Sequence, residues 1–346
     1  MTKRPQDKLS VLIIGCGNIA GGFDAARPAD ALPLTHASAF QQHGGFKLAA
    51  CVEPNAKRSD AFQMHWGVVE AFASLNAIRD RVGQFDVISI CSPTSFHADH
   101  LQAAFDLRPR LVFCEKPVTT DSEHTEKWVR QYEDAGVLLT VNHTRRWAPD
   151  VKRLHDELRD GVWGEVRSVV CHYNKGIQNN GGHMVDLLHY LLGPLELSCV
   201  GSVVWDYWDD DPSISAVLQF SHDVPIYLNI AHAGDYSYFE LQLVTALGVV
   251  IMEDAGLHWR LRRVIDSPQF KGYRALGESE CIAGEYAQSM GKAVANIHDA
   301  LRMDVPLMST GRTALQAQQI CDQINRAALT GQSSTLNIHT HSGHLS

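Results

Sequence analysis

The sequence lacks the features that would assign it to a membrane, a secretory route or a nucleic acid. No apolar run approaches the ~18 to 20 residues of a membrane span, and the first ten residues, MTKRPQDKLS, hold no apolar segment of the kind that signal peptides carry. No block of lysine and arginine stands out, and the net charge is -9, so the phosphates of a nucleic acid would find no basic surface. We expect a cytoplasmic protein whose partner is a small molecule, with no nucleic acid and no membrane involved.

Paired cysteines are also missing. The eight cysteines are scattered along the chain without a CxxC pair, and disulfides are rare in the reducing compartment expected here. We therefore expect buried, reduced thiols at the five cysteines that lie in apolar, strand-like surroundings, which are Cys16, Cys51, Cys91, Cys114 and Cys171.

The length and composition are those of a folded chain with two domains. The chain has 346 residues, more than one hydrophobic core usually supports. Residues 1–143 alternate short apolar runs with longer amphipathic stretches, which predicts βαβ units on a doubly wound parallel sheet. Their nearly continuous apolar character is expected where helices cover both faces of a sheet. The predicted strands begin at Leu9, Lys47, Asp86, Arg110 and Gly136.

Residues 144–332 follow another pattern. Between Glu196 and Val264 several apolar stretches are separated by short turns, and in YFELQLV the residues Phe239, Leu241 and Leu243 alternate with polar ones. This alternation predicts an α+β domain with an open, mainly antiparallel sheet. Its uncovered apolar face predicts a homodimer or homotetramer. Residues 333–346 are expected to form a loose tail whose histidines bind no metal.

The first predicted strand leads into a glycine-rich turn. In VLIIGCGNIA, Gly15, Gly17 and Ala20 form a G-x-G-x-x-A arrangement. The first glycine permits a tight turn, the second lets the backbone approach a pyrophosphate, and the small third residue lets a helix pack closely. Phosphate is then expected on the N–H groups of a helix start. The same spacing also fits a tight strand-to-helix turn that binds no ligand. The position of the motif after the first strand of an alternating domain favours a dinucleotide site, which would include Asn18 and Ile19.

The second predicted strand ends in AACVEPN, with Glu53 as its last acidic residue. A carboxylate there accepts hydrogen bonds from the ribose hydroxyls of NAD and repels the 2'-phosphate of NADP. The alternative interpretation is that Glu53 is only a solvated charge at the end of a strand. NADP is not excluded, because Lys57 and Arg58 lie nearby and the spacing from Gly15 is longer than usual. We assign the extra length to an insertion, FDAARPADALPL, before a helix that begins near His36.

The stretches GCGNIA, VEPN, SPTSFH and EKP follow successive predicted strands, and in them the sequence resembles the Gfo/Idh/MocA family from about Leu9 to about Ala328. The resemblance implies hydride transfer between a nicotinamide cofactor and a hydroxyl group of a sugar, polyol or sugar derivative. EKP is the most specific motif: it implies a cis bond between Lys116 and Pro117 and a lysine that reaches the reacting carbon. The implied cofactor contacts also include Ser92, Pro93, His97 and Glu115.

The chemistry expected of Lys116 also follows from its position. An ammonium group stabilises the alkoxide-like oxygen that develops as hydride leaves a carbinol carbon. At the carboxyl end of a parallel strand, the side chain points into the crevice where ligands bind. The alternative is a structural salt bridge to Glu115, which is disfavoured because neighbours on a strand face opposite sides.

A second group of candidates lies in NNGGHMVDLLHYLLGP. The resemblance implies substrate contacts from Asn179 and Asp186, with His183 as the acid/base at the start of a helix; an imidazole suits this role because its ordinary pKa of ~6.5 lies near working pH. Asn179 stands where inositol-oxidising members carry aspartate and adds no negative charge. A metal site is disfavoured, since His183 and His189 lie about 120° apart around a helix. His189 is expected on the helix surface.

Three basic residues complete the candidate substrate site. Arg145 and Arg146 follow the last strand of the parallel sheet, where a solvated pair between domains is an equal alternative, and Lys175 precedes the histidine segment. Asn179 also gives a weak similarity to members that act on nucleotide-linked amino sugars. Two other functions fit the same fold. An NAD-dependent glycosidase without net redox change would use the same Lys116 and His183, whereas a nucleotide-sensing regulatory protein would need neither.

Overall fold

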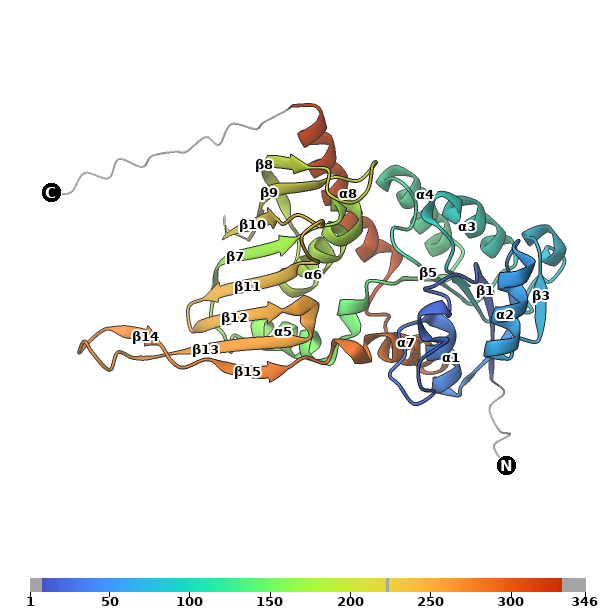
Figure 1. Ribbon diagram of the computed structural model, residues 1–346, viewed down its shortest axis with the longest axis horizontal. Coiled ribbons are helices and arrows are strands. Elements are labelled where there is room, and N and C mark those ends of the chain that lie inside the picture. Colours follow the sequence, from blue (N-terminus) through green and yellow to red (C-terminus); the bar gives the residue numbers. More distant parts are fainter. Residues whose placement is uncertain (1–7, 222–223, 332–346) are drawn as a thin grey trace. The chain divides into compact units, whose positions relative to one another are not determined.

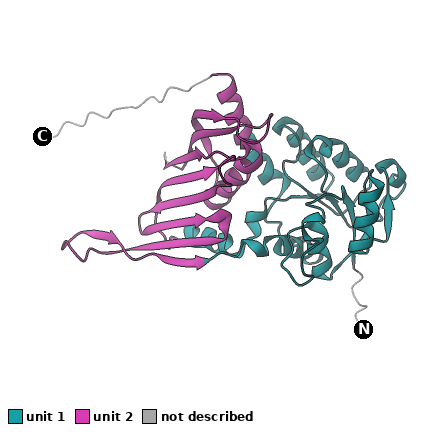
Figure 2. Ribbon diagram, viewed as in Figure 1, with its two compact units in different colours: residues 1–159, 283–319 teal, residues 160–282, 320–346 magenta. Residues whose placement is uncertain are grey.

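The computed structural model describes residues 8–221 and 224–331, which form two compact units (Figures 1 and 2). The first unit comprises Met1–Arg159 and Ala283–Gln319, and the second comprises Asp160–Ile282 and Ile320–Ser346. The loose tail expected at residues 333–346 lies outside the described residues. No helix in the described ranges is long and apolar enough to cross a membrane.

The first unit contains a six-stranded parallel sheet with the order β3-β2-β1-β4-β5-β6. This is the strand order of a dinucleotide-binding fold, and it confirms the predicted parallel sheet. The short strand β3 was not predicted, because three residues show no periodicity. The strands are β1 (Leu9–Ile14), β2 (Phe46–Val52), β3 (Glu70–Phe72), β4 (Val87–Ile90), β5 (Leu111–Cys114) and β6 (Leu138–Val141).

Helices cover both faces of this sheet, as the continuous apolar strands predicted. On β1, Val11 and Ile13 belong to one hydrophobic core, and Leu12 and Ile14 belong to a second core. The first core includes residues of α1 (His36–His43), α2 (Ala56–Trp66) and α7 (Ser289–Met303). The second includes residues of α3 (His97–Asp106), α4 (Ser122–Asp134) and the first part of α8 (Gly311–Leu329).

The predicted domain boundary after residue 143 falls within this first unit. Residues 144–159, which include α5 (Pro149–Arg159), and the α7 helix both belong to it. The reason is packing, because Trp147 and, on α7, Val294 and Ile297 are buried in the first core of the parallel sheet.

The second unit contains a nine-stranded sheet with the order β14-β13-β12-β11-β7-β10-β9-β8, in which β15 pairs with β13. The pairs along this path are antiparallel except for β7 with β10. The open, mainly antiparallel sheet is therefore confirmed. Its strands are β7 (Val166–Tyr173), β8 (Glu196–Val204), β9 (Ser213–Phe220), β10 (Val224–Ile230), β11 (Phe239–Thr245), β12 (Gly248–Glu253), β13 (His258–Asp266), β14 (Arg274–Leu276) and β15 (Glu280–Ala283).

The alternation predicted for β11 is present. Phe239, Leu241 and Leu243 are buried, whereas Glu240 and Gln242 are half-buried on the other face. The second unit also contains α6 (Gly182–Leu192), which follows β7 through a π-helix at Gly176–Gly181. The cysteines are free thiols, and the five expected to be buried are buried.

Candidate functional site

The glycine-rich turn after β1 has the geometry of a nucleotide-binding loop. Gly15 has a φ of +86°, and a Cβ atom there would lie 2.9 Å from the backbone nitrogen of Ser92, so both conformation and space require glycine. A Cβ atom at Gly17 would meet no heavy atom within 4 Å. The turn is therefore packed against the protein at Gly15 and open at Gly17, where a pyrophosphate is expected to approach.

Four successive backbone amides of this turn have no protein acceptor. Within the described part of the chain, no hydrogen bond uses the N–H groups of residues 17–20, while the N–H of Cys16 donates to Oε2 of Glu53 at 3.0 Å. A run of unpaired N–H groups in a turn binds anions, because their partial positive charges converge. This turn therefore fits the phosphates of a dinucleotide.

Phosphate was expected on the N–H groups of a helix start, but this turn does not open an α-helix. It continues as a short 3-10 helix (Gly22–Asp24), and α1 begins at His36, as the sequence predicted. The first amides of α1 are already used, since His36 N–H donates to the carbonyl of Ile19 at 3.2 Å and Ala37 N–H to that of Ala20 at 2.8 Å. Phosphate is therefore expected on the turn itself and not on α1.

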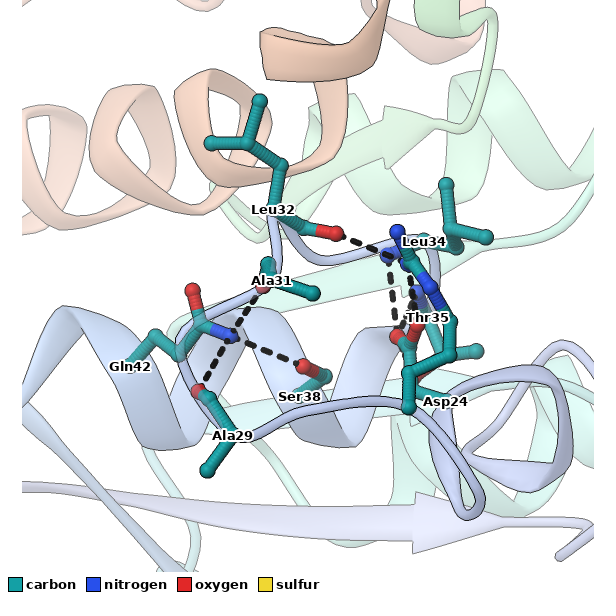
Figure 3. Close-up of polar contacts among 9 residues, drawn as sticks. Asp24, Ala29, Ala31, Leu32, Leu34, Thr35, Ser38 and Gln42 are labelled. Atoms are coloured by element: carbon teal, nitrogen blue, oxygen red, sulfur yellow. Dashed lines mark hydrogen bonds and ion pairs between the residues drawn. The ribbon is translucent and has the colours of Figure 1, made fainter.

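The insertion before α1 is organised by Asp24, which the sequence did not single out (Figure 3). Its Oδ2 accepts hydrogen bonds from the backbone N–H groups of Leu34 and Thr35, both at 2.9 Å, and its Oδ1 accepts one from Arg27 at 2.7 Å. Burial opposes the charged carboxylate, but the bonds from Arg27 and Thr35 hold the pKa of Asp24 below its ordinary value. Gln42 of α1 ties the same loop to the helix through the carbonyls of Ala29 and Ala31.

Glu53 lies at the end of β2 with its carboxylate held in place. The side chain is buried, its Oε1 accepts a hydrogen bond from Asn55 N–H at 3.0 Å, and Arg58 lies 3.4 Å from the same oxygen. A pocket of about 470 Å³ opens beside Glu53, and Asp60 and Glu70 also line it. Three carboxylates around one pocket disfavour an additional phosphate there.

The EKP motif follows β5, and its Lys116–Pro117 peptide bond is cis. Oε1 of Glu115 accepts a hydrogen bond from Nδ2 of Asn142 at 2.6 Å. The same oxygen lies 2.9 Å from Nε2 of His36. The Nδ1 atom of His36 lies 2.7 Å from Oγ of Ser89. Glu115 therefore has an ionic partner, His36 of α1, from outside its own strand.

The electrostatics of this pair favour an imidazolium and a carboxylate. Burial lowers the pKa of the fully buried His36, but Cys91 and then Glu115 outweigh burial and raise it to about 10. Burial raises the pKa of Glu115, but His36, Asn142 and, more weakly, the charge of Lys116 bring it below its ordinary value. A buried ion pair thus supports the loop that carries Lys116.

This pair predicts a pH-dependent stability. Because the pKa of His36 is raised, the stabilisation of the fold by His36 is complete below its unfolded pKa of ~6.5. This stabilisation is lost as the pH rises through about 10. Because the pKa of Glu115 is lowered, its contribution is present above its unfolded pKa and is lost as the pH falls through the folded one. We expect His36→Gln to lower the free energy of unfolding by about 3 to 5 kcal/mol at about pH 6, and by less towards pH 10.

Urea unfolding measured across this pH range tests the prediction. The matched control is His124→Gln, because His124 forms an exposed pair with Asp121 at 2.6 Å and such surface pairs contribute only ~0 to 1 kcal/mol. A deficit in His36→Gln that is equal at both ends of the range would contradict the ionic role of His36.

His97 connects two loops of the site. It is fully buried, its Nδ1 lies 2.9 Å from the carbonyl oxygen of Pro117, and its Nε2 lies 2.9 Å from that of Ser92. The hydroxyl of Ser92 in turn lies 2.7 Å from Nδ1 of His100, and Pro93 precedes a short 3-10 helix at Thr94–Phe96. Both ring nitrogens of His97 are thus engaged with backbone carbonyls, so its position indicates support of the loops.

Arg145 and Arg146 lie in a 3-10 helix (Thr144–Trp147) that follows β6. They are 7% and 5% exposed, so the solvated pair considered from the sequence is wrong. The guanidinium of Arg145 lies 4.9 Å from the ring centroid of Tyr286, and Nη1 of Arg146 donates to the carbonyl of Met308 at 3.4 Å. Both of these contacts lie within the first unit.

In the second unit, the segment after β7 is held by two aspartates that the sequence analysis missed. The backbone N–H of Lys175 donates to Asp206 at 3.0 Å, and that of Asn179 donates to Asp211 at 2.9 Å. Gly176 has a φ of +89°, and a Cβ atom there would lie 2.0 Å from Oδ2 of Asp211, so only glycine fits. Both aspartates lie in the stretch WDYWDDDP, which no motif links to residues 175–179.

The histidine segment has the predicted helical form. His183 is the second residue of α6 and is half-buried, whereas Asp186, one turn later, is buried. The helix ends at Leu192, where Gly193 N–H donates to the carbonyl of His189 at 3.0 Å. His189 is half-buried and not on the surface as expected. His183 and Lys116 belong to different compact units.

Comparison with known proteins agrees with the geometry of the first unit. Residues 9–143 match the model of a family named GFO_IDH_MocA and described as an oxidoreductase family with an NAD-binding Rossmann fold. This range spans β1 to β6 and includes the glycine turn, Glu53 and the EKP motif. The predicted resemblance to this family is confirmed over residues 9–143, and the predicted dinucleotide-binding fold is confirmed.

Individual relatives extend over most of the chain at low identity. Inositol 2-dehydrogenase of Rhizobium meliloti strain 1021 is 22% identical over 84% of this chain and 92% of its own length. D-glucoside 3-dehydrogenase of Escherichia coli strain K12 is 26% identical, over 56% of each protein. Among solved structures, the WlbA dehydrogenase of Bordetella pertussis in complex with NADH and UDP-GlcNAcA has a TM-score of 0.72 at 19% identity, covering 94% of this chain and 97% of that chain.

Proposed function

We propose that this member of the Gfo/Idh/MocA oxidoreductase family transfers hydride between a nicotinamide cofactor, NAD in preference to NADP, and a hydroxyl-bearing carbon of a sugar, polyol or sugar derivative. The observation that carries the proposal is the turn at residues 17–20, whose four unpaired amides lie at the carboxyl end of β1 in a fold of this family. The cofactor, when bound, supplies the group that exchanges hydride. Side chains of this protein stabilise the developing charge, exchange the proton and contact the substrate.

We assign Lys116 to the developing oxygen charge and His183 to proton exchange with the reacting hydroxyl. Asn179 and Asp186 lie in the same helical segment as His183, and with Lys175, Arg145 and Arg146 they are the proposed substrate contacts. Glu115 and His97 support the loop that carries Lys116 through their contacts with His36 and Pro117.

The proposal is tested by incubating the protein with NAD and a panel of substrates. The panel comprises myo-inositol, D-glucose, methyl and phenyl β-D-glucopyranoside, cellobiose and UDP-glucose. We expect NADH to accumulate with at least one of them. Release of phenol from the phenyl glucoside without net NADH would support the NAD-dependent glycosidase instead. If no sugar in the panel reacts and NADH does not stabilise the protein in a thermal-shift measurement, both the oxidoreductase and the NAD-dependent glycosidase would be excluded.

The cofactor preference gives a separate prediction. We expect the wild type to bind NADH more tightly than NADPH, because the buried carboxylate of Glu53 repels a 2'-phosphate. Glu53→Gln keeps an acceptor for the N–H of Cys16 but removes the charge. The ratio of the NADPH dissociation constant to the NADH dissociation constant should therefore fall by about tenfold, which equals ~1.4 kcal/mol. Fluorescence titration with both nucleotides measures it.

The control for Glu53 is Glu123→Gln, since Glu123 is an exposed glutamate in the first turn of α4 that does not line the pocket beside Glu53. We expect this variant to keep the wild-type preference. Equal or tighter binding of NADPH by the wild type would overturn the assignment of NAD.

The half-buried face of the sheet in the second unit supports a proposed homo-oligomer. On β10, Tyr227 is 42% exposed, and the polar residues of β11 lie half-buried on the face away from the core. A second copy of the chain would cover this face. Light scattering should then report more than one chain per particle.

A further inference from the structure

One edge of the sheet in the second unit brings together three loops. Ile230 at the end of β10 and Phe239 at the start of β11 both stand level with Tyr173 at the end of β7. Val204 and Ser213 pair across the neighbouring strands β8 and β9. The loops at 205–212 and 231–238 therefore lie at the same sheet edge as the segment that follows β7.

These two loops carry large aromatic side chains that are exposed. Their exposed fractions are 54% for Trp205, 57% for Tyr207, 45% for Trp208 and 63% for Tyr236. The rings of Tyr207 and Trp208 lie 4.7 Å apart in an edge-to-face arrangement. We name these four residues the aromatic platform. Exposed aromatic groups at one place usually mark a binding site.

Hydrogen bonds fasten the loop at 205–212 to the candidate catalytic segment. Asp206 lies between Trp205 and Tyr207 in the sequence, and its Oδ2 accepts the backbone N–H groups of Lys175 at 3.0 Å and Ala233 at 3.1 Å. The Nζ atom of Lys175 lies 5.3 Å from the centroid of the Tyr207 ring. The platform is thus held next to a residue proposed to contact substrate.

The loop at 231–238 is fastened to the same segment. Nδ2 of Asn174 donates to the carbonyl of Tyr236 at 2.6 Å, and Oδ1 of Asn174 accepts the N–H of Tyr238 at 3.2 Å. Asn174 is fully buried and directly precedes Lys175. Both loops are therefore anchored on residues 174–179, which lead into α6 and His183.

We propose that the aromatic platform binds a second ring of the substrate, so that the substrate is a neutral glycoside and not a free monosaccharide or polyol. This inference rests on the proposed function, in which His183 acts on the first ring. The C–H faces of a sugar ring, or the face of an aromatic aglycone, pack against indole and phenol rings. Three exposed aspartates on the same loops, Asp209, Asp210 and Asp235, disfavour the diphosphate of a nucleotide-linked sugar.

The first test compares one-ring and two-ring ligands in the full chain with NAD present. We expect cellobiose and phenyl β-D-glucopyranoside to have a KM about tenfold lower than that of D-glucose. Trp208→Ala and Tyr207→Ala should raise the KM of the two-ring ligands by about the same factor, while kcat and the KM of D-glucose stay within about twofold. Trp208→Phe should restore most of the binding, because a ring face is retained.

The matched control is Tyr273→Ala, since Tyr273 is 70% exposed but lies directly before β14, away from the edge that carries Lys175. This variant should behave as the wild type with every ligand. Tighter binding of UDP-glucose than of phenyl glucoside would overturn the neutral-glycoside assignment. Loss of oligomers in Trp208→Ala, seen by light scattering, would identify the platform as a subunit contact and overturn the proposal.

Tryptophan fluorescence titration separates this inference from the proposed function, because it requires no turnover. Suppose that phenyl glucoside quenches the tryptophan fluorescence of the wild type but not that of Tyr207→Ala, and that no sugar yields NADH. This result would support the binding role of the platform and reject the oxidoreductase function. NADH formed from D-glucose and cellobiose with equal KM values, unchanged in Tyr207→Ala and Trp208→Ala, would retain the oxidoreductase and reject the platform.

Discussion

Replacing Lys116 by methionine is expected to leave NADH affinity nearly intact and to lower the rate of hydride transfer by about 10²- to 10³-fold, the usual loss for one donor that stabilises a developing oxyanion. Lys116 follows β5 directly, at the carboxyl edge of the parallel sheet where ligands bind in such folds. Methionine keeps much of the side chain's length and apolar character but removes the positive charge. The loss should therefore appear in kcat.

Single-turnover hydride transfer, measured beside NADH affinity, separates this role from folding. Lys127→Met is the matched control, because Lys127 is an exposed lysine on α4 of the same unit, and it should retain wild-type rates. Hydride transfer in Lys116→Met at a rate close to that of the wild type would refute the catalytic role and leave Lys116 as part of the loop structure.

His183→Asn should lower the rate by about 10²- to 10⁴-fold, because proton exchange with the hydroxyl then passes to water or another group. Asparagine retains a polar side chain of similar size but does not titrate. The pH profile of kcat/KM should lose the limb that reports the imidazole. His189→Asn, a change on the same helix, should keep both the rate and the pH profile.

The double variant asks whether the two residues act in one step. If they do, Lys116→Met with His183→Asn should lose less than the product of the two single losses, because the second change removes assistance to a step already impaired. Strictly multiplicative losses would assign the two residues to independent steps. Unchanged pH dependence in His183→Asn would exclude His183 as the acid/base.

The parallel sheet of the first unit was predictable because its strands are buried on both faces and are therefore apolar without interruption. The alternation of β11 likewise reports a sheet with one buried face. Both signals are local, since each depends on which side chains of a single strand meet a core. The glycine turn and the EKP motif were found for the same reason, as short stretches whose residues act together.

The partners of the site residues were not predictable, because they come from distant parts of the chain. The contact of Glu115 with His36 joins residues 79 positions apart, and the contact of Asn179 with Asp211 joins residues 32 apart. No periodicity or motif links such pairs. The bonds that organise the insertion before α1 were missed for the same reason, because the carboxylate of Asp24 takes the amides of Leu34 and Thr35, which lie 10 and 11 residues further along the chain.

The α7 helix, which comes late in the sequence, makes the nucleotide-binding unit impossible to isolate by truncation. A fragment ending near residue 159 would contain all six parallel strands, α1 and α2 but would lack Ala293, Val294 and Ile297, and so would expose to water the part of the first core that α7 covers. During synthesis that part of the core stays uncovered until most of the chain has been made. Stable folding of the first unit is therefore expected to follow completion of the chain, and domain exchange between relatives would have to move two separate segments together.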